Sequence, residues 1–91
     1  MDVEDDTMSR RIFIVEDSLG FILRLRRAFA KALPDFEIEV AYTTKSAKEW
    51  LLGAVLDPPA LIWLDWYLPD VNGESVLAYA RSLPEYEDVP I

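Results

Sequence analysis

The chain has 91 residues and a mass of 10.4 kDa, which suffices for one small domain. It contains no cysteine and no histidine, which excludes disulfide scaffolds, thiolate zinc sites, cysteine nucleophiles, imidazole bases and phosphohistidine carriers. Seventeen acidic against nine basic residues give a net charge of −8, which disfavours direct binding to nucleic acid. Its apolar runs are far shorter than the roughly 20 residues that a membrane span needs, and no signal-peptide pattern opens the chain. We therefore expect a cytoplasmic protein without membrane contact.

The first folded element is predicted directly after an acidic N-terminal segment. Residues 1–9 are polar, acidic and without periodicity, which is typical of a disordered tail, and residues 10–91 are expected to form the domain. Ile12-Phe13-Ile14-Val15 is a continuous β-favouring apolar run, as in a parallel strand that is covered on both faces. This strand ends at two adjacent carboxylates, Glu16 and Asp17.

Two helices and a second strand are predicted over residues 18–55. Apolar residues recur at helical spacing over 18–33, with Asp17 or Ser18 as the N-cap. Residues 37–42 alternate between polar and apolar, which is typical of a half-buried or edge strand. Ser46 followed by Glu49 has the spacing of a capping box and predicts that the second helix begins there.

The remaining residues repeat the strand–helix order. Residues 60–64 form a second apolar run, in which Trp63 is expected in the core, and this run ends at Asp65. A turn-rich segment over 68–73 precedes a helix over 73–83, and 84–88 are predicted as loop. Residues 89–91 read as the start of a further strand. This alternation predicts an α/β fold with a parallel sheet and right-handed crossovers.

Acidic residues follow two of the predicted strands. Ligands of open parallel sheets bind at the carboxyl ends of the strands, so Glu16, Asp17 and Asp65 converge there if the two strands are neighbours. Like charges this close need a cation, and oxygen ligands without histidine or cysteine suit Mg²⁺. Such a site brings a phosphoryl group to a carboxylate nucleophile. The alternative is that Asp17 is a simple helix cap and Asp65 an ordinary turn residue.

Two sequence blocks resemble a known family. Ile14-Val15-Glu16-Asp17-Ser18 and the block from Leu64 to Gly73, with its Asp-x-x-Leu-Pro pattern, look like the signature motifs of response-regulator receiver domains (CheY-like). The resemblance covers residues 10–91 and implies a flavodoxin-like, doubly wound sheet in strand order 2-1-3, with three βα units and the start of a fourth strand. It implies that Asp65 accepts a phosphoryl group from a partner histidine kinase or phosphotransfer protein, without the chain being an enzyme.

The resemblance also implies a metal site. Asp17 and Asp65 would be direct Mg²⁺ ligands, Glu16 an outer ligand through water, and the backbone carbonyl of Tyr67 a further ligand. Receiver domains have five strands, whereas this chain stops at the start of the fourth. The serine or threonine after the fourth strand and the lysine after the fifth are therefore absent. Lys31, Lys45 and Lys48 fall on predicted helices, which places them away from the strand ends.

Three readings of function follow. The first is a Mg²⁺-dependent receiver domain in a two-component pathway. The second is a degenerate receiver-like module for protein interaction or dimerisation that is never phosphorylated. The third, a haloacid-dehalogenase-like phosphatase, needs an aspartate where Tyr67 stands. Because the missing elements would leave apolar surface bare, residues 10–91 are expected to form a homodimer, by element exchange or otherwise, or to be part of a longer protein. The kinase, the signal and the output cannot be read from the sequence.

Overall fold

The computed structural model describes residues 9–68 and 73–91. The predicted acidic tail, residues 1–9, lies almost entirely outside this part, as does most of the predicted turn segment, and both stay predictions. None of the helices in the described part is long and apolar enough to cross a lipid bilayer.

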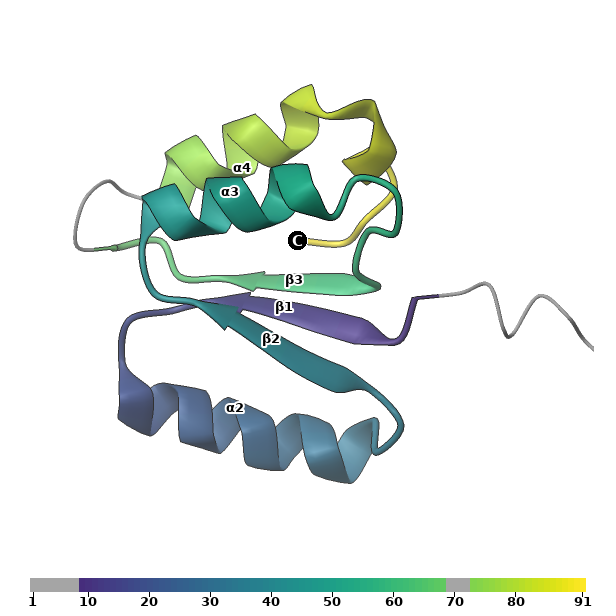
Figure 1. Cartoon of the computed structure of the whole chain (residues 1–91). Helices are drawn as coiled ribbons and strands as arrows, with labels where there is room; N and C mark the ends of the chain where they lie inside the picture. Colours follow the sequence, from purple (N-terminus) through teal and green to yellow (C-terminus); the bar gives the residue numbers. More distant parts are fainter. Residues whose placement is uncertain (1–8, 69–72) are drawn as a thin grey trace, which may run out of the picture.

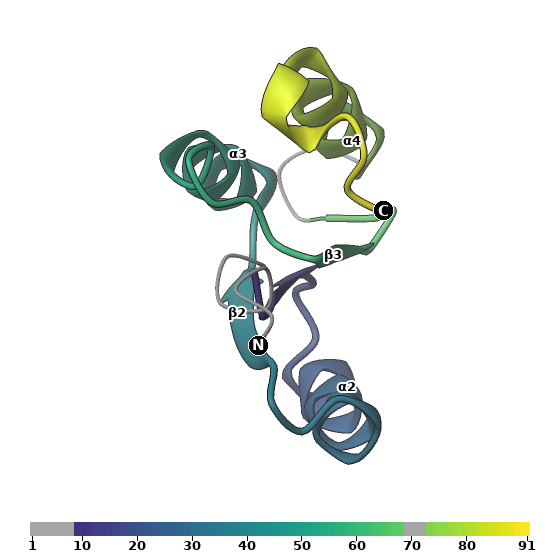
Figure 2. The same cartoon turned by 90° about the vertical axis from the view of Figure 1, so that its right-hand side faces the viewer.

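A parallel sheet in the order β2-β1-β3 forms the centre of the described chain. In chain order the elements are β1 (Arg11–Val15), α2 (Leu19–Ala32), β2 (Glu37–Ala41), α3 (Thr44–Gly53), β3 (Leu61–Leu64), α4 (Gly73–Ser82) and the 3₁₀ helix η1 (Pro84–Tyr86). Figures 1 and 2 show α2 on one face of the sheet and α3 with α4 on the other. The predicted α/β class and strand order are confirmed.

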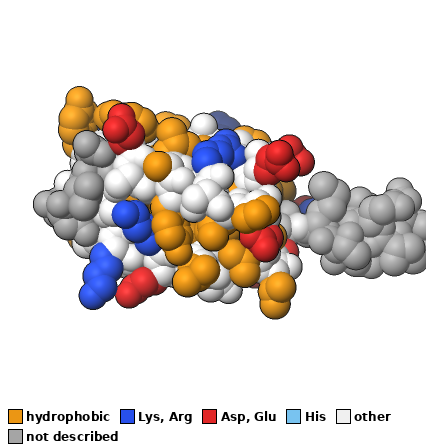
Figure 3. Space-filling view, turned by 90° about the horizontal axis from the view of Figure 1, so that it is seen from above, with side chains coloured by type: hydrophobic (Ala, Val, Ile, Leu, Met, Phe, Trp, Pro, Cys, Tyr) orange, Lys and Arg blue, Asp and Glu red, His pale blue; other side chains and the backbone are white. Residues whose placement is uncertain are grey.

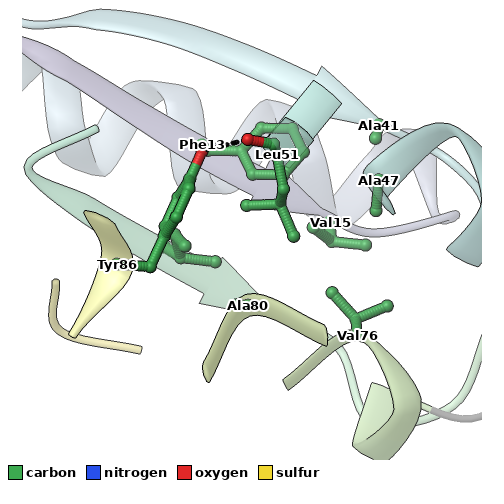
Figure 4. Close-up of a cluster of buried hydrophobic side chains, with 9 residues drawn as sticks. Phe13, Val15, Ala41, Ala47, Leu51, Val76, Ala80 and Tyr86 are labelled. Carbon is green, nitrogen blue, oxygen red and sulfur yellow. Dashed lines mark hydrogen bonds between the residues drawn. The ribbon is translucent and has the colours of Figure 1, made fainter. Parts of the chain in front are cut away.

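Strand β1 is paired at both edges because it lies between the other two strands, and it is buried on both faces because helices cover both sides of the sheet (Figures 1 and 2). Phe13 and Val15 point into the larger core, between the sheet and helices α3 and α4. Ile12 and Ile14 point into the smaller core, between the sheet and α2. Residues 12–15 are all apolar because side chains on both faces of β1 are buried. Figure 4 shows the larger core, formed by Phe13, Val15, Ala41, Ala47, Leu51, Ile62, Val76, Ala80 and Tyr86.

The sequence predicts the N-cap of α2 correctly but not that of α3. Ser18 caps α2, and its side chain accepts a hydrogen bond from the amide of Phe21. Helix α3 begins at Thr44, earlier than the predicted Ser46, because Thr43 is the N-cap and Ser46 its reciprocal partner in the capping box. The prediction was wrong because Thr43 and Ser46, which are also three positions apart, form a capping box one turn before the expected pair of Ser46 and Glu49.

Two further sequence predictions differ from the structure. Trp63 is 38% exposed rather than in the core, because β3 is the last strand of the described sheet. Its ring lies 5.9 Å from the ring of Phe21 in α2. Residues 89–91 form no strand, but the carbonyl of Pro90 accepts a hydrogen bond from the amide of Ile62 at 2.9 Å. The start of a fourth strand is therefore present as one contact at the edge of β3.

Residues 84–86 form a 3₁₀ helix rather than a loop, and this places Tyr86 in the core. Its side chain is fully buried, and its hydroxyl donates a hydrogen bond of 2.7 Å to the carbonyl of Leu51, which Figure 4 shows as a dashed line. Burial raises the pKa of Tyr86 to about 12. The phenol thus ties the C-terminal part of the chain to α3.

We expect Tyr86→Phe to lower the free energy of unfolding by about 1 kcal/mol at pH 7, because the Leu51 carbonyl loses its buried donor. The unfolded tyrosine ionises near pH 10 and the folded one near pH 12, so the wild type should also lose stability between these values. The variant should lack that contribution. Urea unfolding at pH 7 and at alkaline pH measures both effects, and equal stability at pH 7 would contradict the first.

Candidate functional site

The carboxyl edge of the sheet brings together the three acidic residues that follow β1 and β3. These strands are paired, with Val15 opposite Leu64, so the residues after them are neighbours. The amide of Asp65 donates to the carbonyl of Val15 at 2.8 Å, and the amide of Glu16 donates to Ala41 at 3.0 Å. The backbone of both acidic positions is therefore held by the sheet itself.

The side chains of Glu16, Asp17 and Asp65 form one cluster. Each offers a carboxylate oxygen, and these oxygens lie within 4.8 Å of one another. Glu16 is buried, Asp65 is half-buried and Asp17 is exposed. The cluster therefore has a closed inner side and an open outer side, which suits an ion that keeps some of its water.

Glu16 is held on the inner side of the cluster by backbone donors. Its Oε2 accepts hydrogen bonds from the amides of Asp17 at 3.1 Å and Ser18 at 3.0 Å. Burial raises the pKa of Glu16 above its ordinary value, and the nearby Asp65 carboxylate raises it further, although the two amides oppose the shift. A bound cation would reverse the repulsion, because it favours the ionised form of every carboxylate around it.

In metal-free buffer we expect Glu16→Gln to be more stable than the wild type at pH 7. A carboxyl group whose pKa is raised by folding binds its proton more tightly in the folded state, so it destabilises the fold once the pH exceeds that pKa. The advantage of the variant should shrink as the pH falls and vanish below the ordinary glutamate pKa of 4.5. Thermal melts of both proteins from pH 7 down to this pKa, with Asp17 and Asp65 intact, measure the difference in melting temperature. A stabilisation by Glu16→Gln that grows toward low pH would contradict the prediction.

The segment after β3 adds a backbone donor to the cluster. The amide of Tyr67 donates to Oδ1 of Asp65 at 3.3 Å, while the Tyr67 side chain is 79% exposed. No contact tests the role expected for the Tyr67 carbonyl, which stays a prediction. The amide of Gly73, the first residue of α4, donates to the carbonyl of Trp66 at 2.5 Å. The chain therefore returns to the Asp65–Trp66 peptide when α4 begins.

The first turn of α3 also lies at this edge of the sheet. Helix α3 begins at Thr44, directly after the carboxyl end of β2, and Figure 1 shows its first turn near the strand ends. Lys45 is an exposed residue of this first turn, and its expected distance from the acidic cluster stays a prediction. Lys31 is in the last turn of α2, at the other edge, as expected.

Two features of the site were missed from the sequence. One is the close approach of Gly73 to the Asp65 backbone, for which the only signal was a glycine at the end of a turn-rich segment. The other is an apolar groove of about 340 Å³ beside Trp66, at the edge of β3 that faces away from β1. The groove is lined by Leu61, Ile62, Trp63, Leu64, Trp66, Leu77 and Ile91.

Comparison with known proteins supports the resemblance at the level of structure. No family model matches the chain, and no curated protein matches it. Solved structures do match: the phosphorylated cyanobacterial phytochrome response regulator RcpA has a TM-score of 0.80 at 30% identity, over 90% of this chain and 61% of its own. The bacteriophytochrome response regulator AtBRR has a TM-score of 0.77 at 26% identity, over 90% of this chain and 63% of its own.

A third match carries a metal ion. The receiver domain of a sensor histidine kinase from Pseudomonas aeruginosa, with magnesium coordinated in its active-site cleft, has a TM-score of 0.69 at 22% identity. It aligns over 91% of this chain and 64% of its own. The chain thus spans less than two thirds of the length of these structures. In topology and in its acidic edge, the chain is thus similar to response-regulator receiver domains (CheY-like), which are its structural neighbours.

Proposed function

We propose that the chain is a Mg²⁺-dependent phosphoacceptor in a two-component pathway, with Asp65 as the residue that receives the phosphoryl group. The observation that carries this proposal is the gathering of three carboxylates within 4.8 Å at the carboxyl edge of a parallel sheet. It is supported by the similarity to RcpA, which was solved in its phosphorylated form. The donor would be a histidine kinase or phosphotransfer protein, since this chain has no histidine of its own.

The donor set fits magnesium rather than a softer metal. Its side-chain donors are all carboxylate oxygens, and such hard ligands with open positions for water suit Mg²⁺. Asp17 and Asp65 would bind the ion directly, Glu16 would act through a water molecule, and the Tyr67 carbonyl would complete the protein ligands. When bound, the ion supplies positive charge that offsets the negative charge of the phosphoryl oxygens.

The chemical step that we propose is a displacement at phosphorus. A carboxylate oxygen of Asp65 forms a bond to the phosphorus, and the bond from phosphorus to the donor nitrogen breaks. The electron pair of that bond stays with the donor imidazole, and the product is an acyl phosphate on Asp65. The amide of Tyr67, which donates to Asp65 Oδ1, orients the carboxylate. The β1–β3 ladder fixes its backbone.

We propose that the chain works in the cytoplasm as an acceptor that is modified once per cycle, not as an enzyme that turns over a substrate. Direct binding to nucleic acid has no support on the face formed by α3 and α4. Figure 3 shows acidic and basic side chains mixed there with hydrophobic ones, rather than a basic surface. Its partners would then be other proteins of the pathway.

The experiment that tests the proposal is incubation of the protein with a small phosphodonor and Mg²⁺, followed by intact-mass spectrometry. A phosphoryl adduct that needs Mg²⁺ supports the proposal. An unchanged mass would contradict phosphorylation and favour an interaction module. Steady release of phosphate from an excess of donor, with the protein recovered unmodified, would instead indicate a phosphatase.

A second candidate function, a receiver-like interaction or dimerisation module, is favoured by the apolar groove at the edge of β3. Trp63 and Trp66 are 38% and 43% exposed there, and the Ile62 amide already pairs with one carbonyl from outside the sheet. Such an edge invites pairing with another chain or exchange of elements. Light scattering over a range of concentrations tests it, because self-association should be weakened by Trp63→Lys and unaffected by Leu56→Lys, since Leu56 is 98% exposed and does not line the groove.

A further inference from the structure

The three glycines of the chain all lie in helices, but their surroundings differ sharply. A Cβ atom added to Gly20 in α2 or to Gly53 in α3 would meet no atom within 4 Å. A Cβ atom on Gly73 would clash with the carbonyl oxygen of Asp65 and lie 2.9 Å from Trp66 Cα. These neighbours are backbone atoms, which cannot move aside as the end of a side chain does. Position 73 therefore has no room for a side chain in this arrangement.

We propose that Gly73 is a positioning residue for the acceptor site, an inference that rests on the function proposed above. Because Gly73 lacks a side chain, the first turn of α4 rests directly on the peptide between Asp65 and Trp66. Its amide donates to the Trp66 carbonyl, while the Asp65 amide on the other side donates to Val15. The acceptor's backbone is thus held between β1 and the start of α4.

A side chain at position 73 would have to displace either the first turn of α4 or the peptide between Asp65 and Trp66. Helix α4 is anchored in the larger core by Val76 and Ala80, which are both 1% exposed. If α4 stays in place, a methyl group at position 73 pushes the Asp65–Trp66 peptide away. The Asp65 carboxylate would then move relative to Glu16 and Asp17, and Mg²⁺ demands near-ideal ligand geometry. The effect should appear in metal binding and not only in stability.

The test compares three matched variants, Gly73→Ala, Gly20→Ala and Gly53→Ala, by isothermal titration calorimetry with MgCl₂ and by thermal melting without metal. We expect Gly73→Ala to weaken Mg²⁺ binding by at least tenfold at a temperature where circular dichroism shows it folded. The other two should bind Mg²⁺ like the wild type and melt at the same or a higher temperature, because alanine favours helices. If Gly73→Ala is too unstable alone, combining it with the two other substitutions provides a more stable background for the same titration.

The outcomes separate this inference from the proposed function. A Gly73→Ala protein that melts earlier but binds Mg²⁺ with wild-type affinity would show a purely structural role and overturn the inference alone. A wild type that shows no Mg²⁺ binding would overturn the proposed function and, with it, the positioning role. Weakened binding in all three variants would also contradict the inference, because the clash is specific to position 73.

Discussion

Asp65→Asn is expected to abolish the phosphoryl adduct that the wild type forms with a small phosphodonor and Mg²⁺. An amide nitrogen and a neutral amide oxygen replace the carboxylate, so the nucleophile is lost while the size of the side chain is kept. The fold should persist, because Asp65 is only half-buried and its amide still pairs with Val15. Intact mass reports the adduct, and circular dichroism reports the fold.

The matched control for this substitution is Asp35→Asn. Asp35 is exposed and lies between α2 and β2, at the opposite edge of the sheet from the acidic cluster. This variant should form the adduct at the wild-type rate. Equal adduct formation by wild type and Asp65→Asn would place the acceptor elsewhere and contradict the assignment.

Phe13→Ala is expected to have the largest effect on stability, about 3–5 kcal/mol. Phe13 has no exposed surface, and its ring stacks on Trp50 with centroids 3.9 Å apart, so alanine would leave a cavity between β1 and α3. Small domains are stable by roughly 5–15 kcal/mol, and this chain is short. The variant should therefore be partly or wholly unfolded at 37 °C, as measured by urea and thermal unfolding.

Leu56→Ala provides the comparison for this core substitution. Leu56 is 98% exposed, so its removal should change the free energy of unfolding by less than about 0.5 kcal/mol. Similar losses for the two variants would mean that Phe13 does not lie in a packed core. The order of the two effects follows from burial alone.

The fold was predictable because the hydrophobic pattern changes period at each element. The run Ile12–Val15 is apolar throughout, since both faces of β1 are covered, whereas β2 alternates because it is an edge strand. The strand order came from family resemblance, and the structure confirms it. Because β1 and β3 are neighbouring parallel strands, their carboxyl ends lie at the same edge of the sheet, and Glu16 therefore lies close to Asp65.

What the sequence could not supply depends on contacts between distant residues. The N-cap of α3 is a local feature, but the sequence offers two capping pairs, Thr43 with Ser46 and Ser46 with Glu49, and the structure uses the first. The exposure of Trp63 depends on what covers the edge of β3, which composition does not reveal. Tyr86 looked like a loop residue, and its burial depends on packing in the larger core and on a hydrogen bond to Leu51, 35 positions away. The clash at Gly73 likewise needs three-dimensional coordinates.

The most direct test of the acidic cluster is a thermal melt of the wild type at increasing MgCl₂ concentration, with Asp17→Asn alongside. An ion that binds only the folded chain stabilises it by about 1.4 kcal/mol at ten times its Kd, or roughly 5–10 °C for a domain of this size. We predict that the wild type melts later as Mg²⁺ rises and that Asp17→Asn, which alters an exposed ligand, responds far less. A wild-type melting temperature that does not depend on Mg²⁺ would contradict a divalent-ion site at Glu16, Asp17 and Asp65.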